Sequence, residues 1–440
     1  MHQHTRAART GTRPSSTSRG AFRHGKTVVA AVLGATLLLA TAGCSTASAA
    51  GDGGKTVLKV YGWKGGDAEP ANISEINDAF EKANPDIDLQ FEFVPANDKY
   101  TQRVQPELLA GNAADVIMTD SAKVQDWGSS GYLEDLSASD WTSNVRSEVT
   151  PFIQNAGTTY ALPMEVIGIS LYANNDLLKK AGVDSVPTTW PEFEAALQKA
   201  KDAGITPLSL PNKGGWTGSS ALNAIAASLV YKHNPDFDQQ FLDGKASFSS
   251  WKTSAQQLMD LQSKGFVSFA DELGVDEWTT GISDFEAGKS AFYVQGAWNQ
   301  SAFEKAGLND SFIPWPAETS GASNANLFVG TMWSVNAASK VKDAAEKYVD
   351  FWADSANASP FLEAENAVSP FSNGTSPSSP ATKAFVDAVD AGDYRILPSN
   401  TWFSAAGEKV MQQEVQALWL GQQDIDQTLQ NLDKKLAPTG

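Results

Sequence analysis

The sequence predicts an α/β fold in which strands and helices alternate and form mostly parallel sheets with helices on both faces. Short runs rich in β-branched and aromatic residues alternate with segments whose apolar residues recur every three or four positions. This alternation is typical of βαβ units. About 400 residues remain once the leader described below is removed, and one hydrophobic core rarely serves so long a chain, so we expect two domains.

The local signals place the elements along the chain. Ile73, Ile76 and Phe80 fall on one helical face, and Asn84-Pro85 ends that helix. Thr189 to Glu192 form a capping box that opens a helix reaching about residue 203. The other predicted elements are strands at 57–61, 87–93, 115–118 and 167–172, and helices at 100–109 and 176–180.

The N-terminus predicts a secretory signal peptide at residues 1–43. Its first 26 residues carry six basic residues and no acid, and residues 27–42 are uncharged and largely apolar. A permanent membrane span needs about 20 apolar residues, so a cleaved signal is the better interpretation. Residues 44–55, which are mostly small, predict a flexible tether.

Cys44 is the only cysteine, so it forms no internal disulfide. With Ala42 and Gly43 before it, Cys44 resembles the lipidation site of a bacterial lipobox, although Thr41 stands where a leucine is usual. The resemblance implies a secreted protein anchored to the outer face of the cytoplasmic membrane through a lipid on Cys44.

The charge argues against nucleic-acid partners. Removing the leader takes away six of the 33 basic residues and none of the 51 acidic ones, so the mature chain carries a net charge of −24. Such a surface repels phosphate backbones and favours solubility.

The sequence lacks the residues that most common catalytic mechanisms require. Three of the four histidines lie in the leader, which leaves His233 alone, and no G-x-S-x-G motif is present. The same counts argue against a zinc site made of histidine and cysteine. Gly288-Lys289-Ser290 resembles the end of a P-loop, but Ser283 replaces the required first glycine. We therefore expect no catalytic residue, no metal and no cofactor, although 51 acids leave a glycosidase open.

The chain has thirteen tryptophans, and packing in a core is the ordinary use of this residue. Four of them lie in glycine- or asparagine-rich turns instead: Trp63, Trp216, Trp298 and Trp402. A sugar ring presents apolar C–H faces and a rim of hydroxyls, so its site combines flat aromatic faces with amides and carboxylates.

Several segments resemble the family 1 extracellular solute-binding proteins, the family of maltose-binding protein. They are residues 171–182 (LYANNDLLKKAG), 187–193 (PTTWPEF), 285–299 and 330–353. The resemblance implies a two-lobed periplasmic-binding-protein fold with crossing hinge strands and a ligand cleft between the lobes. One lobe would comprise residues 56–165 and 333–379, and the other residues 166–332 and 380–440.

The resemblance also implies ligand-binding residues. Trp298, after Gln295 and Gly296, matches the aromatic residue that stacks on sugar, while Thr119 stands where maltose-binding protein has a tryptophan. The complete expected set is Trp63, Thr119, Asp120, Glu165, Trp216, Gln295, Gly296, Trp298 and Trp402.

The implied function is capture of a mono- or oligosaccharide by a monomer that delivers it to the permease subunits of an ABC importer. Three alternatives remain at this point. A secreted glycosidase would place two carboxylates about 5–10 Å apart across the cleft. A binding protein for another solute, such as a peptide, a polyamine or a metal complex, is the second alternative, and a cleft lined by acids without exposed tryptophan faces would favour a cationic ligand. An adhesin or sensor subunit would bind no small ligand.

Overall fold

The computed structural model of the chain describes residues 54–63, 69–95, 98–374, 376 and 379–438. The predicted signal peptide, Cys44 and the tether as far as residue 53 lie outside them.

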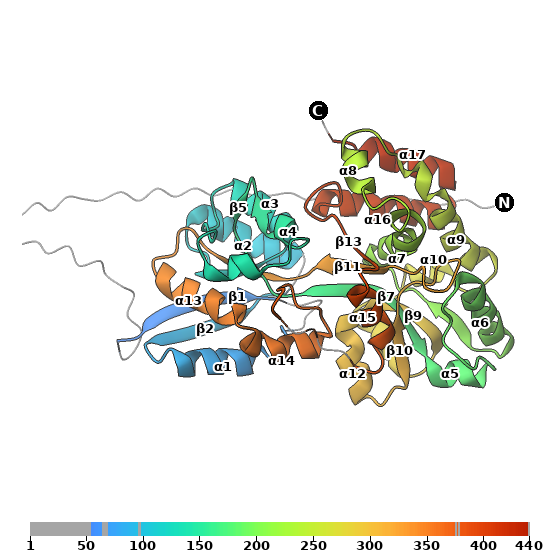
Figure 1. Cartoon of the computed structure of the whole chain (residues 1–440), viewed down its shortest axis with the longest axis horizontal. Helices are drawn as coiled ribbons and strands as arrows, with labels where there is room; N and C mark the ends of the chain where they lie inside the picture. The colour runs from blue at the N-terminus through green and yellow to red at the C-terminus, as the bar shows by residue number, and fades with distance from the viewer. Residues whose placement is uncertain (1–53, 64–68, 96–97, 375, 377–378, 439–440) are drawn as a thin grey trace, which may run out of the picture. The chain divides into compact units, whose positions relative to one another are not determined.

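The first sheet has the strand order β2–β1–β3–β12–β6. Its strands are β1 (Thr56–Gly62), β2 (Ile87–Phe93), β3 (Val116–Thr119), β6 (Leu162–Pro163) and β12 (Met332–Val335). The helices around it are α1 (Ile73–Ala83), α2 (Asp98–Ala110), α3 (Ser121–Ser129), α4 (Thr150–Ile153), α13 (Lys342–Ala353) and α14 (Ser355–Glu365) (Figure 1). We call this group the first lobe; it also holds the short pair β4 (Gln154–Asn155) and β5 (Thr158–Thr159).

The second sheet has the order β13–β11–β7–β9–β8, and β10 pairs with β7. Its strands are β7 (Val166–Asn174), β8 (Thr206–Ser209), β9 (Ser290–Gly296), β10 (Asp310–Ile313), β11 (Ala325–Val329) and β13 (Tyr394–Ile396).

The helices of this second lobe come from two stretches of the chain, one before β12 and one after α14. They are α5 (Asn175–Lys180), α6 (Trp190–Asp202), α7 (Trp216–Ala226), α8 (Phe237–Leu242), α9 (Lys252–Ser263), α10 (Phe269–Glu272), α11 (Thr280–Glu286), α12 (Gln300–Lys305), α15 (Lys383–Asp390), α16 (Ala405–Trp419) and α17 (Ile425–Leu436). Helix α7 contacts β7, β9 and β11, and α16 lies against α7.

Three stretches of the chain pass between the lobes, and the third of them runs from α14 to α15. Strand β7 follows Glu165 directly, and all nine of its residues are buried. Strand β11 leads through Gly330 and Thr331 into β12 of the first sheet. Val166 also exchanges backbone hydrogen bonds with Val368. These crossing segments fix the place where the lobes join.

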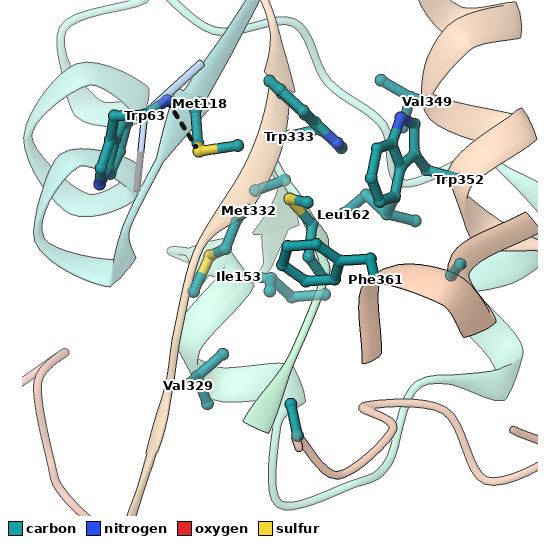
Figure 2. Packing of buried hydrophobic residues seen from close by; sticks show 14 of the residues in the cluster. Trp63, Met118, Ile153, Leu162, Val329, Met332, Trp333, Val349, Trp352 and Phe361 are labelled. Carbon is teal, nitrogen blue, oxygen red and sulfur yellow. Dashed lines mark hydrogen bonds between the residues drawn. The ribbon is translucent and has the colours of Figure 1, made fainter. Parts of the chain in front are cut away.

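The first lobe packs around β12. Figure 2 shows Trp333 of β12 beside Val349 and Trp352 of α13, and Phe361 of α14 close by. The ring centroids of Trp333 and Trp352 are 5.8 Å apart, and those of Trp352 and Phe361 are 5.6 Å apart. Burying aromatic rings of this size contributes strongly to a core.

The predicted strands and helices are confirmed, including the capping box, in which the Thr189 hydroxyl accepts from the Glu192 N–H and the Glu192 carboxylate accepts from the Thr189 N–H. The expectation of mostly parallel sheets is wrong. Strand β1 is parallel to β2 and β3, but β12 is antiparallel to β3, and β7 is antiparallel to β9, β10 and β11. The crossing segments cause this, because a strand that arrives from the other lobe enters the sheet in the opposite direction.

Candidate functional site

Three tryptophans differ from the rest in exposure. Ten of the thirteen are at most 9% exposed, whereas Trp216, Trp278 and Trp298 are partly exposed. These three lie together, and we call them the tryptophan trio. The ring centroids of Trp216 and Trp278 are 5.5 Å apart at 29°, those of Trp278 and Trp298 are 5.6 Å apart at 22°, and those of Trp216 and Trp298 are 6.0 Å apart. The trio thus forms an aromatic surface that solvent reaches.

Trp216 is held at the start of α7 by a tight backbone turn. Gly215 has φ +89°, and a Cβ atom there would lie 2.8 Å from Nε2 of Gln416. Asn212 Oδ1 accepts hydrogen bonds from the Thr217 hydroxyl and the Gly218 N–H, both at 3.0 Å. Only glycine allows α16 to approach the turn this closely.

Trp298 lies two residues beyond the end of β9, in the short 3₁₀ turn Ala297–Asn299. Its ring folds back over Gly296, where a Cβ atom would be 2.2 Å from the ring. Phe328 of β11 meets Trp298 edge-to-face at 6.2 Å. Gly296 is therefore required for the orientation of the ring, and its carbonyl accepts from the Tyr172 hydroxyl at 2.9 Å.

Gln295 is fully buried, and its amide is used inside the protein. Nε2 donates to the Glu277 carbonyl at 3.0 Å and to the Tyr293 hydroxyl at 3.1 Å, and Oε1 accepts from the Gly296 N–H at 2.9 Å. The structure gives Gln295 a role in fixing the end of β9.

Three predicted residues lie at adjacent strand ends in the first lobe. Trp63 follows β1, its ring lies 4.3 Å from that of Tyr100, and Lys123 Nζ is 5.0 Å from the Trp63 ring. Asp120 follows β3, caps α3 by accepting from the Lys123 N–H at 2.8 Å, and forms an ion pair with the Lys123 ammonium. Thr119 is buried, and its hydroxyl hydrogen-bonds to that of Ser334 at 2.8 Å across the β3–β12 pair.

Glu408 of α16 connects this first-lobe group with the trio. Burial raises the pKa of Glu408, and the charge of Asp120 raises it further, while Gln412 and Lys123 lower it. Gln412 donates to Glu408 at 3.0 Å, and its Cβ also packs close to Gly215, next to Trp216. Charged groups of the first lobe therefore face a part of the second lobe that borders the trio.

Glu165 lies where the lobes cross. It is 1% exposed, and its Oε1 accepts from the Thr331 N–H at 3.2 Å and from the Thr331 hydroxyl at 3.0 Å. A Cβ atom on Gly330 would be 2.5 Å from the same oxygen. The carboxylate thus ties two of the crossing segments, those at Glu165 and Thr331, to each other.

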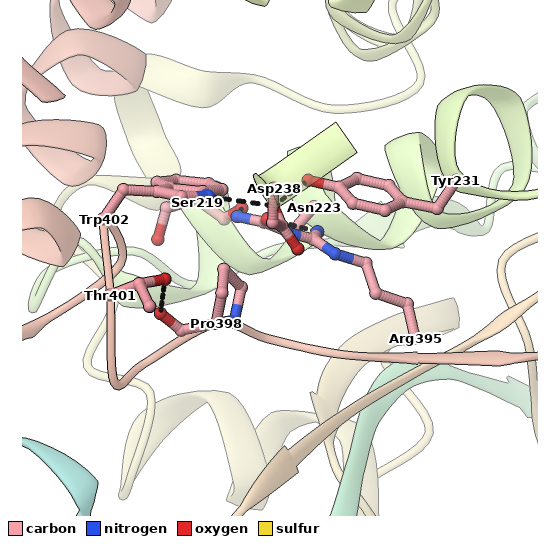
Figure 3. Close-up of polar contacts among 8 residues, drawn as sticks. All are labelled: Ser219, Asn223, Tyr231, Asp238, Arg395, Pro398, Thr401 and Trp402. Carbon is pink, nitrogen blue, oxygen red and sulfur yellow. Dashed lines mark hydrogen bonds and ion pairs between the residues drawn. The ribbon is translucent and has the colours of Figure 1, made fainter. Parts of the chain in front are cut away.

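Trp402 is elsewhere in the second lobe and does not join the trio. It is 4% exposed, and its indole N–H donates to Asp238 at 2.8 Å. Figure 3 shows Trp402, Tyr231 and Arg395 converging on Asp238. The Tyr231 hydroxyl donates to the same oxygen at 2.7 Å, and the Arg395 guanidinium lies 3.6 Å from the Tyr231 ring centroid.

Sequence reasoning missed Trp278, Glu408 and Gln412. Trp278 occupies a turn between α10 and α11, the same kind of position that drew attention to the other loop tryptophans. Glu408 and Gln412 lie on a helix, where nothing in the local sequence separates them from solvent-facing residues.

A cavity of about 270 Å³ lies on the other side of the crossing strands and includes none of the predicted residues. Leu327 and Val166 line it, whereas Phe328, the next residue of β11, faces Trp298. Over the described ranges, no group of acids, histidines and cysteines is arranged to hold a metal ion, and no helix is long and apolar enough to cross a membrane.

The family comparison decides what kind of protein carries this site. The family described as "Bacterial extracellular solute-binding protein" matches residues 65–359. The chain belongs to this family. Its members are binding proteins and not enzymes, which removes the glycosidase alternative.

Named relatives extend the comparison. The maltodextrin-binding protein MdxE of Bacillus subtilis is 27% identical over 272 residues, which cover 59% of this chain and 61% of MdxE. A maltooligosaccharide ABC transporter solute-binding lipoprotein of Streptococcus pneumoniae is 25% identical over 346 residues, covering 73% of this chain and 75% of the lipoprotein. The solved structure of a family 1 extracellular solute-binding protein from Bifidobacterium longum subsp. infantis is 22% identical, covers 87% of this chain and 99% of its own, and has a TM-score of 0.67. This structural likeness supports the two-lobed fold.

Proposed function

We propose that this solute-binding protein captures an oligosaccharide between its lobes and delivers it to the permease of an ABC importer. The observation that carries the proposal is the tryptophan trio: the three partly exposed tryptophans of thirteen stack together. The names of the two relatives, which refer to maltodextrin and maltooligosaccharides, point to a glucose-type oligosaccharide as the first ligand to test.

The chemistry of the site suits such a ligand. The faces of Trp216 and Trp298 would take the C–H faces of successive sugar rings, and Trp278 would extend that surface. Asp120, Lys123 and Glu408 would exchange hydrogen bonds with hydroxyls. Because these polar groups come from both lobes, a ligand that contacts all of them favours the closed arrangement by differential affinity.

Anchoring through Cys44 is a separate part of the proposal. Replacing Cys44 with Ser is expected to release the protein from cells into the medium, because the thiol that would accept the lipid is missing. Labelling with a radioactive fatty acid checks the modification directly. A wild-type protein that is released and unlabelled would show that Thr41 blocks lipidation.

Thermal unfolding in the presence of sugars tests the capture function. We expect maltooligosaccharides to raise the melting temperature, with peptides and polyamines as controls, because ligand at 100 times its Kd adds about 2.7 kcal/mol of stability. Trp298→Ala should reduce the shift to half or less at the same sugar concentration. A shift with a polyamine or peptide and with no sugar would overturn the carbohydrate assignment and leave the family assignment intact.

A further inference from the structure

Glu277 is a buried acid that belongs to no predicted site. It is 2% exposed and directly precedes Trp278 in the turn between α10 and α11. Burying a carboxylate is costly unless hydrogen bonds replace its water. In Glu277 burial raises the pKa, and backbone N–H donors, including those of Gly214 and Gly215, oppose the increase.

The Glu277 side chain holds the segment that carries Trp216. Its Oε1 accepts from the Gly214 N–H at 2.7 Å. A Cβ atom on Gly214 would lie 3.0 Å from that oxygen, so the glycine permits the close approach. The carboxylate therefore fixes the backbone two residues before Trp216.

The Glu277 backbone holds the segment that carries Trp298. Its carbonyl accepts from Gln295 Nε2 at 3.0 Å and from the Tyr293 hydroxyl at 3.4 Å. Gln295 in turn accepts from the Gly296 N–H, and the Trp298 ring lies over Gly296. One residue thus contacts the supports of two trio members and is covalently bonded to the third.

We propose that Glu277 is a positioning residue: its hydrogen bonds set the spacing of Trp216, Trp278 and Trp298 and so create the sugar-stacking surface. The link to sugar rests on the proposed function, whereas the positioning of the three tryptophans by Glu277 does not. A well-packed apolar residue of similar size would stabilise the fold about as well as a buried carboxylate does. The Glu277 carboxylate therefore has a reason to be buried there: its oxygen accepts the hydrogen bond that orients the segment carrying Trp216.

Two variants of the full mature chain test the proposal, with a matched control. Glu277→Leu removes the side-chain acceptors at similar volume and leaves the backbone carbonyl in place. Glu277→Gln keeps one side-chain carbonyl acceptor, and Glu272→Leu changes another acid of the same lobe that does not bind the Gly214 N–H. The ligand-free readout is the exciton contribution of the trio to the circular dichroism spectrum, defined as the difference between the wild type and Trp278→Phe. The second readout is the Kd for maltotriose by calorimetry.

We expect Glu277→Leu to lose more than half of the exciton contribution and to weaken maltotriose binding at least tenfold while unfolding cooperatively. Glu277→Gln should recover at least half of both signals, and Glu272→Leu should match the wild type. A folded Glu277→Leu protein with wild-type signals would overturn the proposal. So would loss of cooperative unfolding in both Glu277 variants, because the residue would then support the lobe as a whole. If the wild type binds no sugar but Glu277→Leu loses the exciton signal, the positioning role stands and the proposed function fails.

Discussion

The second lobe contains two clusters of tryptophan that look alike in sequence and differ in structure. The trio is partly exposed, and its members come from three turns that lie far apart along the chain. The other cluster, which we call the Trp402 cluster, comprises Trp402, Trp251, Tyr231 and Phe248 around Asp238 and Arg395, and its four aromatic residues are at most 4% exposed.

The two clusters also differ in the partners of the acid that each contains. Asp238 accepts from Trp402 and Tyr231, and Arg395, which is 5% exposed, lies 3.4 Å away as a counter-charge. Glu277, next to Trp278, accepts from backbone N–H groups such as that of Gly214, and Glu272 accepts from the Leu210 N–H. Among the residues that the structure describes, neither acid forms an ion pair with a lysine or arginine. The acid of the Trp402 cluster thus has a counter-charge, as in a structural core, whereas Glu277 beside the trio is buried and held by backbone N–H donors.

The largest expected effect is on stability at the Trp402 cluster. Trp402→Ala should lower the free energy of unfolding by about 3–5 kcal/mol, because it leaves a cavity among Phe248, Trp251 and the Arg395 side chain. Denaturant unfolding measures the loss, and the sugar affinity of the folded fraction should stay within about twofold. A mild loss of stability with a large loss of affinity would place Trp402 in the binding site after all.

The second prediction concerns Glu272, an acid at the end of α10 in the second lobe. Burial raises the pKa of Glu272 from 4.5 to about 7. The folded protein therefore holds a proton that the unfolded chain has released, and the stability contribution of Glu272 falls as pH rises from about 4.5 to about 7.

Glu272→Gln removes this titration. We expect the variant to equal the wild type near pH 4.5 and to exceed it by up to about 3 kcal/mol at pH 8, since each pKa unit is worth about 1.4 kcal/mol. Urea unfolding at both pH values measures the difference. A variant that is less stable than the wild type at pH 8 would show that the ionised carboxylate is favourable where it lies.

The third prediction expects the opposite pattern from the first, a large effect on sugar affinity and a small effect on stability. Trp298→Ala should weaken sugar binding about 10- to 100-fold, because a stacking tryptophan at the centre of a site is worth about 1.5–3 kcal/mol. Its free energy of unfolding should change less than that of Trp402→Ala, since the ring is partly exposed. Calorimetry on the folded variant measures the affinity, and equal binding by both variants would erase the distinction between the clusters.

The comparison also shows what the sequence can predict. The strands, the helices and the capping box at Thr189 follow from local patterns, and these are confirmed. The fold class and the family are confirmed as well. The direction of β12 was not predictable from its own residues, because it depends on the chain crossing from the other lobe. The lobe boundaries stay a prediction.

The site was predictable only in part. Trp216 and Trp298 were singled out and lie together, but the same criterion selected Trp402 and passed over Trp278. The residues next to a tryptophan in a turn do not predict whether its ring faces solvent or is buried. The difference depends on partners distant in sequence, such as Asp238 for Trp402 and Gln416 beside the turn of Trp216.

The smallest expected effect lies in the polar half of the site. Burial and the charge of Asp120 raise the pKa of Glu408, so Glu408 is protonated and can donate below that pKa, and only accepts above it. Stacking on the trio has no such dependence. We expect sugar affinity to change about threefold across the titration, the size of one hydrogen bond worth roughly 0.6 kcal/mol.

Glu408→Gln should abolish that pH dependence while Trp298→Ala keeps it at a lower overall affinity, which separates the two halves of the site. Calorimetric titrations between pH 4.5 and pH 8 supply the test, with the ion pair of Lys123 and Asp120 and the amide of Gln412 unchanged in both variants. A dependence that survives in Glu408→Gln would assign the titration to another group and overturn the role given to Glu408.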